Sequence, residues 1–325
     1  KMNPFKSYKT RPGEKHLGEL LKQKNDSDGD YIFLLIPEDI GVRANGGRPG
    51  AADNSSLFYN AISAIQVNEF IPAEKFGWSE VIVSDLQELS QKYLYPENKD
   101  ELRSLVEQVD KRVFQVINNL LKKGKTPLVL GGGHNNAYPL LKALSAVNKE
   151  KIHTLNLDPH PDCRNLEGRH SGNSFSYAKE NGFLKNYAVL GMHENGLNED
   201  SLKKFTSNPD WNYFPFESWT YKGTSTFLKS LEIALKHVCQ TSVFGLEICA
   251  DGIKNCPSSA AVQHGWSWED AFNVAYQSGQ TGRCNYIHLA EVALPLIDPL
   301  MQMSVAKSSV ACLIAFVKGY ESPSF

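Results

Sequence analysis

The chain of 325 residues lacks most of the features that would mark a membrane, secreted or nucleic-acid-binding protein. Its 34 basic and 36 acidic residues leave a formal net charge of -2, so charge gives no reason to expect nucleic acid or an anionic membrane as partner. No apolar run approaches the roughly 20 residues of a membrane span, and the stretch from Lys1 to Phe5 contains no hydrophobic signal segment. The six cysteines form no CxxC pair, which argues against a structural zinc module and is typical of reduced thiols. We therefore expect a cytoplasmic protein that acts on a small molecule.

The apolar pattern is that of an α/β protein. Short apolar runs, which predict strands, alternate with amphipathic stretches, which predict helices. The predicted strands cover residues 31–36, 81–84, 127–130, 152–157, 187–190, 242–248 and 286–291, and the main predicted helices cover residues 99–121, 137–147, 224–237, 268–276 and 304–318. This alternation indicates a mainly parallel sheet between two layers of helices, a three-layer α/β/α sandwich. Because there is no repeat or linker, residues 1–325 are expected to form one domain.

Two carboxylates and an imidazole follow the predicted strand at 152–157. They belong to Asp158, His160 and Asp162, and the prolines between them hold the backbone extended. Alternate residues of an extended chain point the same way, so the three side chains can meet at one point. This combination predicts a metal site, and a solvated strand exit is the alternative.

Three glycines and a histidine follow the predicted strand at 127–130. The glycines at 131–133 let the backbone pass close to a ligand while the imidazole of His134 is delivered to it. The turn lacks both the lysine of a P-loop and the glycine spacing of a dinucleotide-binding turn. His134 is therefore a candidate metal ligand, with a helix-start residue as the alternative.

A third strand, predicted at 242–248, runs into Glu247 and Cys249, which lie on the same face. If the strands are parallel, all three segments end at one edge of the sheet, where open α/β sheets bind ligands. Asp251 could replace one of the two residues if the strand ended one pair later.

These segments resemble the ureohydrolase family, which comprises arginases, agmatinases and formiminoglutamases. Its members share G-G-x-H, D-x-H-x-D and S-x-D-x-D motifs that hold two manganese ions. The first motif matches residues 131–134 and the second matches residues 158–162. The third is only echoed, with Glu247 and Cys249 where the family has two aspartates. The resemblance, nearest to the formiminoglutamase branch, implies an arginase-like fold and a homo-oligomer.

The resemblance also implies a set of metal ligands, namely His134, Asp158, His160, Asp162, Glu247 and Cys249. Asp158 would serve both ions, Glu247 would bridge them, and Cys249 would complete the second position. One or two Mn²⁺ ions are expected, and the thiolate of Cys249 would favour Zn²⁺ or Fe²⁺.

Further residues receive roles by the same resemblance. Glu291, at the end of the last predicted strand, corresponds to a late glutamate of the family that contacts the nitrogen end of the substrate. His170 is a candidate proton shuttle. The residues expected to bind the amino-acid end of the substrate are Arg48, Arg164, Ser171 and Asn173.

Three functions fit this sequence. The leading hypothesis is a metal-dependent hydrolase of linear C–N bonds, acting on a formimino or guanidino group. The second is a family member whose metal site is degraded by Glu247 and Cys249, and which serves as a non-catalytic binding or regulatory protein. The third is a single-metal, deacetylase-like amidase.

Overall fold

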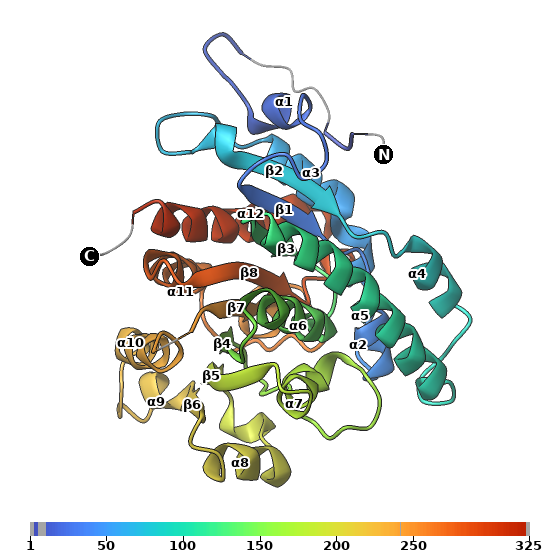
Figure 1. The fold of residues 1–325 in the computed structure, drawn as a ribbon, viewed down its shortest axis with the longest axis vertical. Coiled ribbons are helices and arrows are strands. Elements are labelled where there is room, and N and C mark those ends of the chain that lie inside the picture. Colours follow the sequence, from blue (N-terminus) through green and yellow to red (C-terminus); the bar gives the residue numbers. More distant parts are fainter. Residues whose placement is uncertain (1–2, 6–10, 241, 323–325) are drawn as a thin grey trace.

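The computed structural model describes residues 3–5, 11–240 and 242–322, which are built around one eight-stranded sheet (Figure 1). Every pair of neighbouring strands is parallel, and the strand order is β2-β1-β3-β8-β7-β4-β5-β6. The strands are β1 (Tyr31–Leu35), β2 (Phe76–Glu80), β3 (Thr126–Leu130), β4 (Ile152–Leu157), β5 (Leu184–Met192), β6 (Trp211–Pro215), β7 (Phe244–Cys249) and β8 (Cys284–Ala290).

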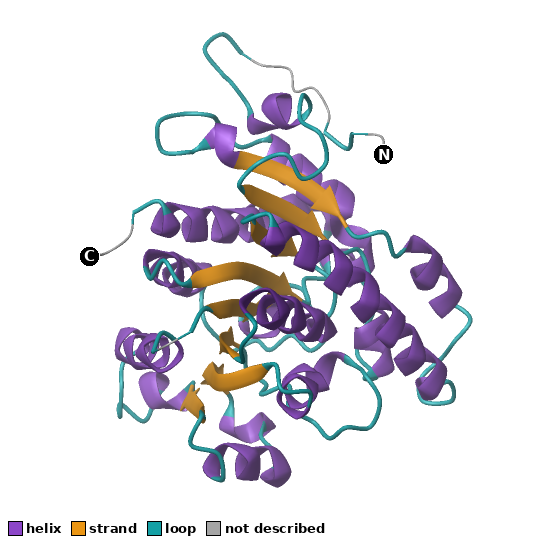
Figure 2. Ribbon diagram, in the orientation of Figure 1, coloured by secondary structure: helices purple, strands orange, loops and turns teal. Residues whose placement is uncertain are grey.

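Helices cover both faces of the sheet (Figure 2). One hydrophobic cluster joins the sheet to α1 (Leu17–Leu21), α3 (Ser55–Ser63), α10 (Phe227–Val238), α11 (Trp268–Gln280) and α12 (Pro299–Tyr320). The other joins it to α2 (Ile40–Ala44), α4 (Ser84–Ser90), α5 (Lys99–Lys122), α6 (Ala137–Asn148), α7 (Ser174–Glu180) and α8 (Glu199–Thr206). A short helix, α9 (Glu217–Thr220), follows β6. The predicted three-layer α/β/α sandwich is confirmed.

The strands form where apolar residues occur on both faces of the chain. In β1, Phe33 and Leu35 belong to one cluster, whereas Ile32 and Leu34 belong to the other. A strand buried on both sides needs such a continuous apolar run, which is why most of the strands could be predicted. The helix predicted at 99–121 is α5, whose first turn carries Asp100 and Glu101 and whose buried face has helical spacing.

The strand predicted at 81–84 is wrong. The strand in this region is β2, which ends at Glu80, and α4 begins at Ser84. Val81 and Val83 are buried in the connection between them, so their burial rather than strand pairing explains the apolar residues. The sequence analysis also missed β6, an edge strand in which only Trp211 is fully buried.

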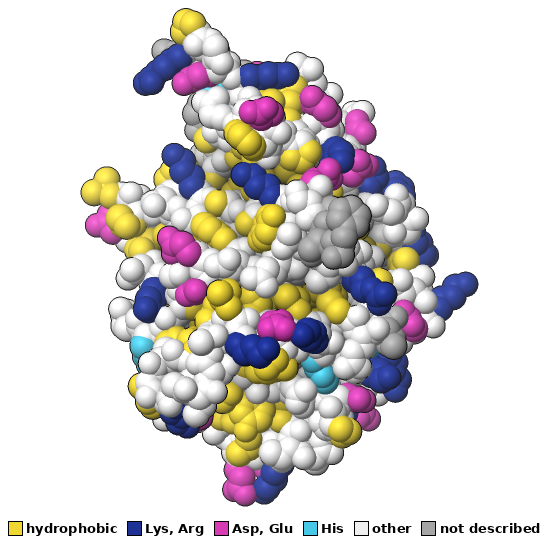
Figure 3. Space-filling model, turned by 90° about the vertical axis from the view of Figure 1, so that its left-hand side faces the viewer, with side chains coloured by type: hydrophobic (Ala, Val, Ile, Leu, Met, Phe, Trp, Pro, Cys, Tyr) yellow, Lys and Arg dark blue, Asp and Glu magenta, His cyan; other side chains and the backbone are white. Residues whose placement is uncertain are grey.

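Helix α12 is the one helix among the described residues that is long and apolar enough to cross a membrane, with a mean hydropathy of 1.6 in its most apolar window. Half of that window is buried inside the protein, where the helix packs against α11, α3 and the sheet. A core helix passes the same test, so this finding is weak evidence for a membrane span. Figure 3 shows one face of the molecule, on which apolar side chains alternate with charged ones of both signs.

Candidate metal centre

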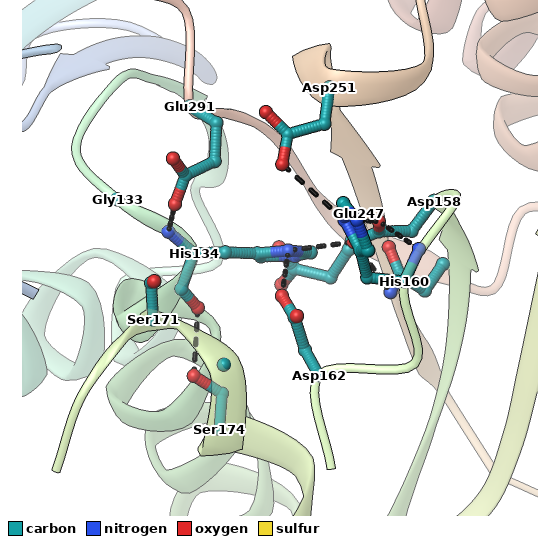
Figure 4. A network of polar contacts seen from close by, with 12 residues as sticks. Gly133, His134, Asp158, His160, Asp162, Ser171, Ser174, Glu247, Asp251 and Glu291 are labelled. Carbon is teal, nitrogen blue, oxygen red and sulfur yellow. Dashed lines mark hydrogen bonds and ion pairs between the residues drawn. The ribbon is translucent and has the colours of Figure 1, made fainter. Parts of the chain in front are cut away.

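The candidate metal ligands and Glu291 lie at or just after the carboxyl ends of four adjacent strands, at the edge of the sheet that the sequence predicts. His134 follows β3, the D-x-H-x-D segment follows β4, and Cys249 is the last residue of β7. Glu291 comes directly after β8, which lies between β3 and β7. Figure 4 shows the side chains of His134, Asp158, His160 and Asp162 close together, with Glu291 hydrogen-bonded to the backbone of His134.

His134 lies against two carboxylates. Its Nδ1 is 2.8 Å from Asp162 Oδ2 and 3.0 Å from Asp158 Oδ2, and all but Asp162 are fully buried. Burial lowers the pKa of His134, but the two carboxylates outweigh it and hold the pKa well above its usual value. The Nδ1 atom of His134 forms no well-aligned hydrogen bond with these oxygens. A buried nitrogen that faces acidic oxygens without such a bond fits a position where a cation would bind.

A second cluster shares Asp158 with the first. His160 Nδ1 is 3.6 Å from Asp158 Oδ1 and 3.5 Å from Asp251 Oδ2. Asp158 therefore presents one carboxylate oxygen to each of the two histidines. Asp251 lies in the turn after β7 and is 5% exposed. It therefore brings a second buried carboxylate to His160, from a different strand end than Asp158.

Cys249 lies next to the first cluster. His134, Asp158 and Cys249 each offer one atom, and the three atoms lie within 4.8 Å of one another, which is compatible with one bound ion. Burial, and then the charge of Asp158, raise the pKa of the Cys249 thiol well above its usual value. The thiol is therefore protonated unless a cation binds beside it.

Glu247, the predicted bridging ligand, is hydrogen-bonded within the sheet, and its role as a bridge stays a prediction. Its Oε1 accepts a hydrogen bond from Tyr286 Oη at 2.7 Å, and its Oε2 is 2.6 Å from His288 Nδ1. The same Oε2 is 3.4 Å from His134 Nε2, the ring nitrogen that does not face the aspartates. Glu247 thus contacts the ring nitrogen of His134 that points away from Asp158 and Asp162.

The backbone at the centre is held in rarely populated conformations. Asp162 and Glu291 have positive φ values of 41° and 69°, which cost roughly 1–3 kcal/mol each for residues with a side chain. Gly131 and Gly132 also have positive φ, and a Cβ at Gly132 would lie 2.2 Å from Asn136 Nδ2, so only glycine fits there. Such conformations persist where the surrounding structure enforces them, which is typical of functional sites.

Two buried glutamates fix the loop that carries His134. Glu291 Oε1 accepts a hydrogen bond from the His134 backbone N–H at 2.7 Å, and its Oε2 accepts one from Ser259 Oγ at 2.6 Å. Glu38, which follows β1, accepts hydrogen bonds from the backbone of Gly133 and from the side chains of Asn135 and Asn136. Glu38 was not predicted from the sequence, because its hydrogen-bond partners lie far along the chain in the turn at 133–136.

A cavity of about 310 Å³ opens next to the two clusters. It is lined by His160, Asp162, Asp251 and Glu291 from the centre, and by the predicted substrate-binding residues Arg48, Arg164 and Ser171. Arg48 is positioned by hydrogen bonds to the carbonyls of Ser258 and Ser259. The volume lies at the lower end of the range for small-molecule sites, so a compact substrate fits.

His170 and Asn173 are not among the residues that line this cavity. His170 is fully buried, with Nε2 3.0 Å from Glu167 Oε1 and Nδ1 accepting a hydrogen bond from the Gly172 N–H. Asn173 is also fully buried, and both ends of its amide are hydrogen-bonded within the same loop, to Arg169 and Gly168 among others. In this arrangement both residues stabilise the loop, and their predicted contacts with substrate stay predictions.

The burial of His170 predicts a pH dependence. Burial lowers the pKa of His170 to about 4, although the hydrogen bond with Glu167 opposes this shift. Below the ordinary histidine pKa of about 6.5 the unfolded chain takes up a proton that the folded protein does not, so the free energy of unfolding falls as pH falls from 6.5 to 4. We expect wild type to lose about 2 kcal/mol more than His170→Gln between pH 7 and pH 5 in urea unfolding without metal. Equal losses in the two proteins would contradict this assignment.

The fold and the clustered side chains define a three-layer α/β protein with a crevice at the strand ends that holds candidate metal ligands. A family model described as the Arginase family matches residues 30–315 of the chain. The chain belongs to the arginase family.

Individual relatives agree with this assignment. Formimidoylglutamase of Macrococcus caseolyticus is 30% identical over 225 residues, covering 69% of this chain and 64% of the relative. Formimidoylglutamase of Chromobacterium violaceum is 31% identical over 161 residues, covering 48% of this chain and 46% of the relative. The matched parts thus span between about half and two thirds of these curated relatives. Both carry the name of an enzyme, so they give no support to the non-catalytic alternative.

Solved structures share the fold. Trypanosoma cruzi formiminoglutamase, crystallised with Mn²⁺, superposes with a TM-score of 0.78 at 19% identity, over 96% of this chain and 100% of that one. Formimidoylglutamase from Bacillus subtilis also gives a TM-score of 0.78, at 16% identity, over 98% and 96% of the two chains. The predicted resemblance is confirmed, whereas the homo-oligomer and the cytoplasmic location stay predictions.

Proposed function

We propose that the protein is a two-metal hydrolase of linear C–N bonds, acting on a small molecule with a formimino or guanidino group. The observation that carries the proposal is the placement of Asp158, whose two oxygens face His134 and His160 separately. A carboxylate between two imidazole clusters is the arrangement that two neighbouring cations need.

The proposed ligands differ from the predicted set in two assignments, because Asp251 replaces Glu247 and Cys249 lies at the first ion rather than the second. His134, Asp158 and Asp162 face the first ion, and Asp158, His160 and Asp251 face the second. Cys249 lies within reach of the first position and adds a sulfur donor. Asp251 takes the place given to Glu247, whose oxygens are occupied by Tyr286 and His288.

The donors suggest which ions bind. Carboxylate and imidazole ligands suit Mn²⁺, which is therefore the proposed cofactor. The sulfur of Cys249 makes Zn²⁺ or Fe²⁺ the competing ions, because a thiolate prefers softer cations. When bound, such ions bring the pKa of water towards neutrality and polarise the substrate, which permits hydrolysis at pH 7.

The residues around the cavity would hold the substrate. Glu291 reaches the cavity with an oxygen that Ser259 orients, and we assign it to the nitrogen end of the substrate. Arg48 and Arg164 line the same cavity and suit a carboxylate at the other end. Ser171 lies beside them and accepts a hydrogen bond from Asn45. The cavity thus offers both acidic and basic side chains to a substrate.

Hydrolysis assays on the reloaded protein test this proposal. The protein is stripped of metal and reloaded with Mn²⁺, Zn²⁺ or Fe²⁺, and product release is measured with formiminoglutamate, guanidino compounds and acetylated amines. We expect hydrolysis of a formimino or guanidino compound, at the highest rate with Mn²⁺. Activity only on acetylated amines with one ion per chain would support the deacetylase-like alternative. Two bound ions without activity on any formimino or guanidino compound would contradict the proposed reaction.

A further inference from the structure

Glu247 is a carboxylate in the interior of the sheet. It is fully buried in β7, where it is paired in register with Asn156 of β4 and His288 of β8. A buried carboxylate is unfavourable unless it is hydrogen-bonded and paired with an opposite charge. Glu247 obtains these partners from one strand, because both Tyr286 and His288 belong to β8.

His288 connects Glu247 to the turn that carries His134. Its Nδ1 is 2.6 Å from Glu247 Oε2, and its Nε2 is 3.1 Å from the carbonyl oxygen of Gly131. A carbonyl can only accept a hydrogen bond, so Nε2 carries a hydrogen. This chain of contacts runs from the carboxylate, through the imidazole, to the first glycine of the 131–134 turn.

Glu247 also reaches the imidazole of His134 from behind. Its Oε2 lies 3.4 Å from His134 Nε2, whereas His134 Nδ1 faces Asp158 and Asp162. The two ring nitrogens of His134 thus face different carboxylates: Nδ1 faces the two aspartates and Nε2 faces Glu247. Figure 4 shows Glu247 beside the ring. A metal-binding histidine commonly donates its second ring N–H to a carboxylate, which fixes the tautomer and the orientation of the ring.

We propose that Glu247, held by Tyr286 and His288, is a positioning residue that fixes His134 with a hydrogen on Nε2 and the Nδ1 lone pair towards the metal. This inference rests on the proposed function, because it needs a metal at Nδ1. In this role Glu247 is a hydrogen-bond partner of the metal ligand His134 and not itself a metal ligand. Loss of the carboxylate would free the ring to adopt the other tautomer, and the affinity for metal would fall.

Metal titration of Glu247→Gln tests the proposal. The dissociation constant for Mn²⁺ is measured by calorimetry on metal-free protein, and we expect it to rise about 10–100-fold. A second readout is the ¹⁵N spectrum of the His134 ring in protein loaded with Zn²⁺, a diamagnetic ion. Wild type should show a hydrogen on Nε2 alone, and Glu247→Gln should show a mixture of tautomers.

Control variants separate positioning from damage to the sheet. Tyr286→Phe removes the hydrogen bond to the other oxygen of Glu247 and should weaken Mn²⁺ binding less than Glu247→Gln does. His288→Asn breaks the connection to Gly131 and should weaken it in the same direction as Glu247→Gln. His153→Asn is the matched control, because His153 is buried in β4 and contacts Val238 near the amino-terminal ends of the strands, away from the candidate ligands. It should leave Mn²⁺ affinity unchanged.

The outcomes also distinguish this inference from the proposed function. If wild type binds neither Mn²⁺ nor Zn²⁺, the proposed function fails and this inference fails with it. If wild type binds metal and folded Glu247→Gln keeps the same dissociation constant and the same His134 tautomer, only the inference about Glu247 is overturned. A metal-loaded structure with Glu247 bound to the ion would overturn it as well.

Discussion

Replacement of Asp158 by Asn should abolish metal binding at both positions of the centre. Asp158 gives one oxygen to the cluster of His134 and the other to the cluster of His160. An amide removes the charge and leaves one oxygen, so neither ion keeps its shared ligand. Replacing a residue that only hydrogen-bonds to a metal ligand already costs about 10–100-fold in metal affinity or activity. For Asp158→Asn we therefore expect metal affinity and activity each to fall by at least about 100-fold. Metal content by mass spectrometry and the rate of hydrolysis measure the effect.

A surface variant controls for the loss of one negative charge. Asp28 is exposed, so Asp28→Asn should bind metal and turn over substrate as wild type does. Thermal unfolding of the metal-free proteins shows whether Asp158→Asn is folded. A folded Asp158→Asn protein that still binds two ions would contradict the role of Asp158 as the shared ligand.

Of the substitutions described, Arg169→Met should lower the free energy of unfolding most. The guanidinium of Arg169 is buried, pairs with Asp110 of α5 at 2.9 Å, and donates hydrogen bonds to the carbonyl of Asn135 and the amide of Asn173. Its removal leaves Asp110 buried and unpaired, which typically costs about 3–5 kcal/mol. The free energy of unfolding from urea titration measures this loss.

The exposed ion pair between Arg112 and Asp85 provides the comparison. It is also a close pair of an arginine and an aspartate, but both side chains are accessible to water. Arg112→Met should therefore reduce stability far less than Arg169→Met, because surface pairs contribute little. Similar losses in the two variants would contradict the importance of burial. Since Arg169 also ties together the loops that carry His134 and His170, its variant should bind Mn²⁺ more weakly.

The sequence predicted which segments lie at the common edge of the sheet, because the end of each buried strand can be recognised from the local apolar pattern. The glycine turn before His134 and the D-x-H-x-D segment each follow a buried apolar run, and parallel strands bring such ends to one edge. The same reasoning failed for the strand at 81–84, where β-branched residues are buried outside the sheet. Apolar pattern reports burial, and burial alone does not distinguish a strand from a packed connection.

The choice between Glu247 and Asp251 could not be made from the sequence. Residues 247, 249 and 251 alternate along the chain, so a shift by two residues keeps the same face and leaves the pattern unchanged. In the structure β7 ends at Cys249, so Glu247 lies inside the strand and Asp251 lies in the turn, which supports our proposal of Asp251 as the ligand. Contacts of Glu38 and Arg169 join segments far apart in the chain, and no local pattern reveals them.

Anomalous diffraction from crystals soaked in Mn²⁺ tests the central claim most directly. We predict two peaks, one next to His134 and Asp162 and the other next to His160 and Asp251, both in contact with Asp158. A single peak, or none, would contradict the two-metal centre.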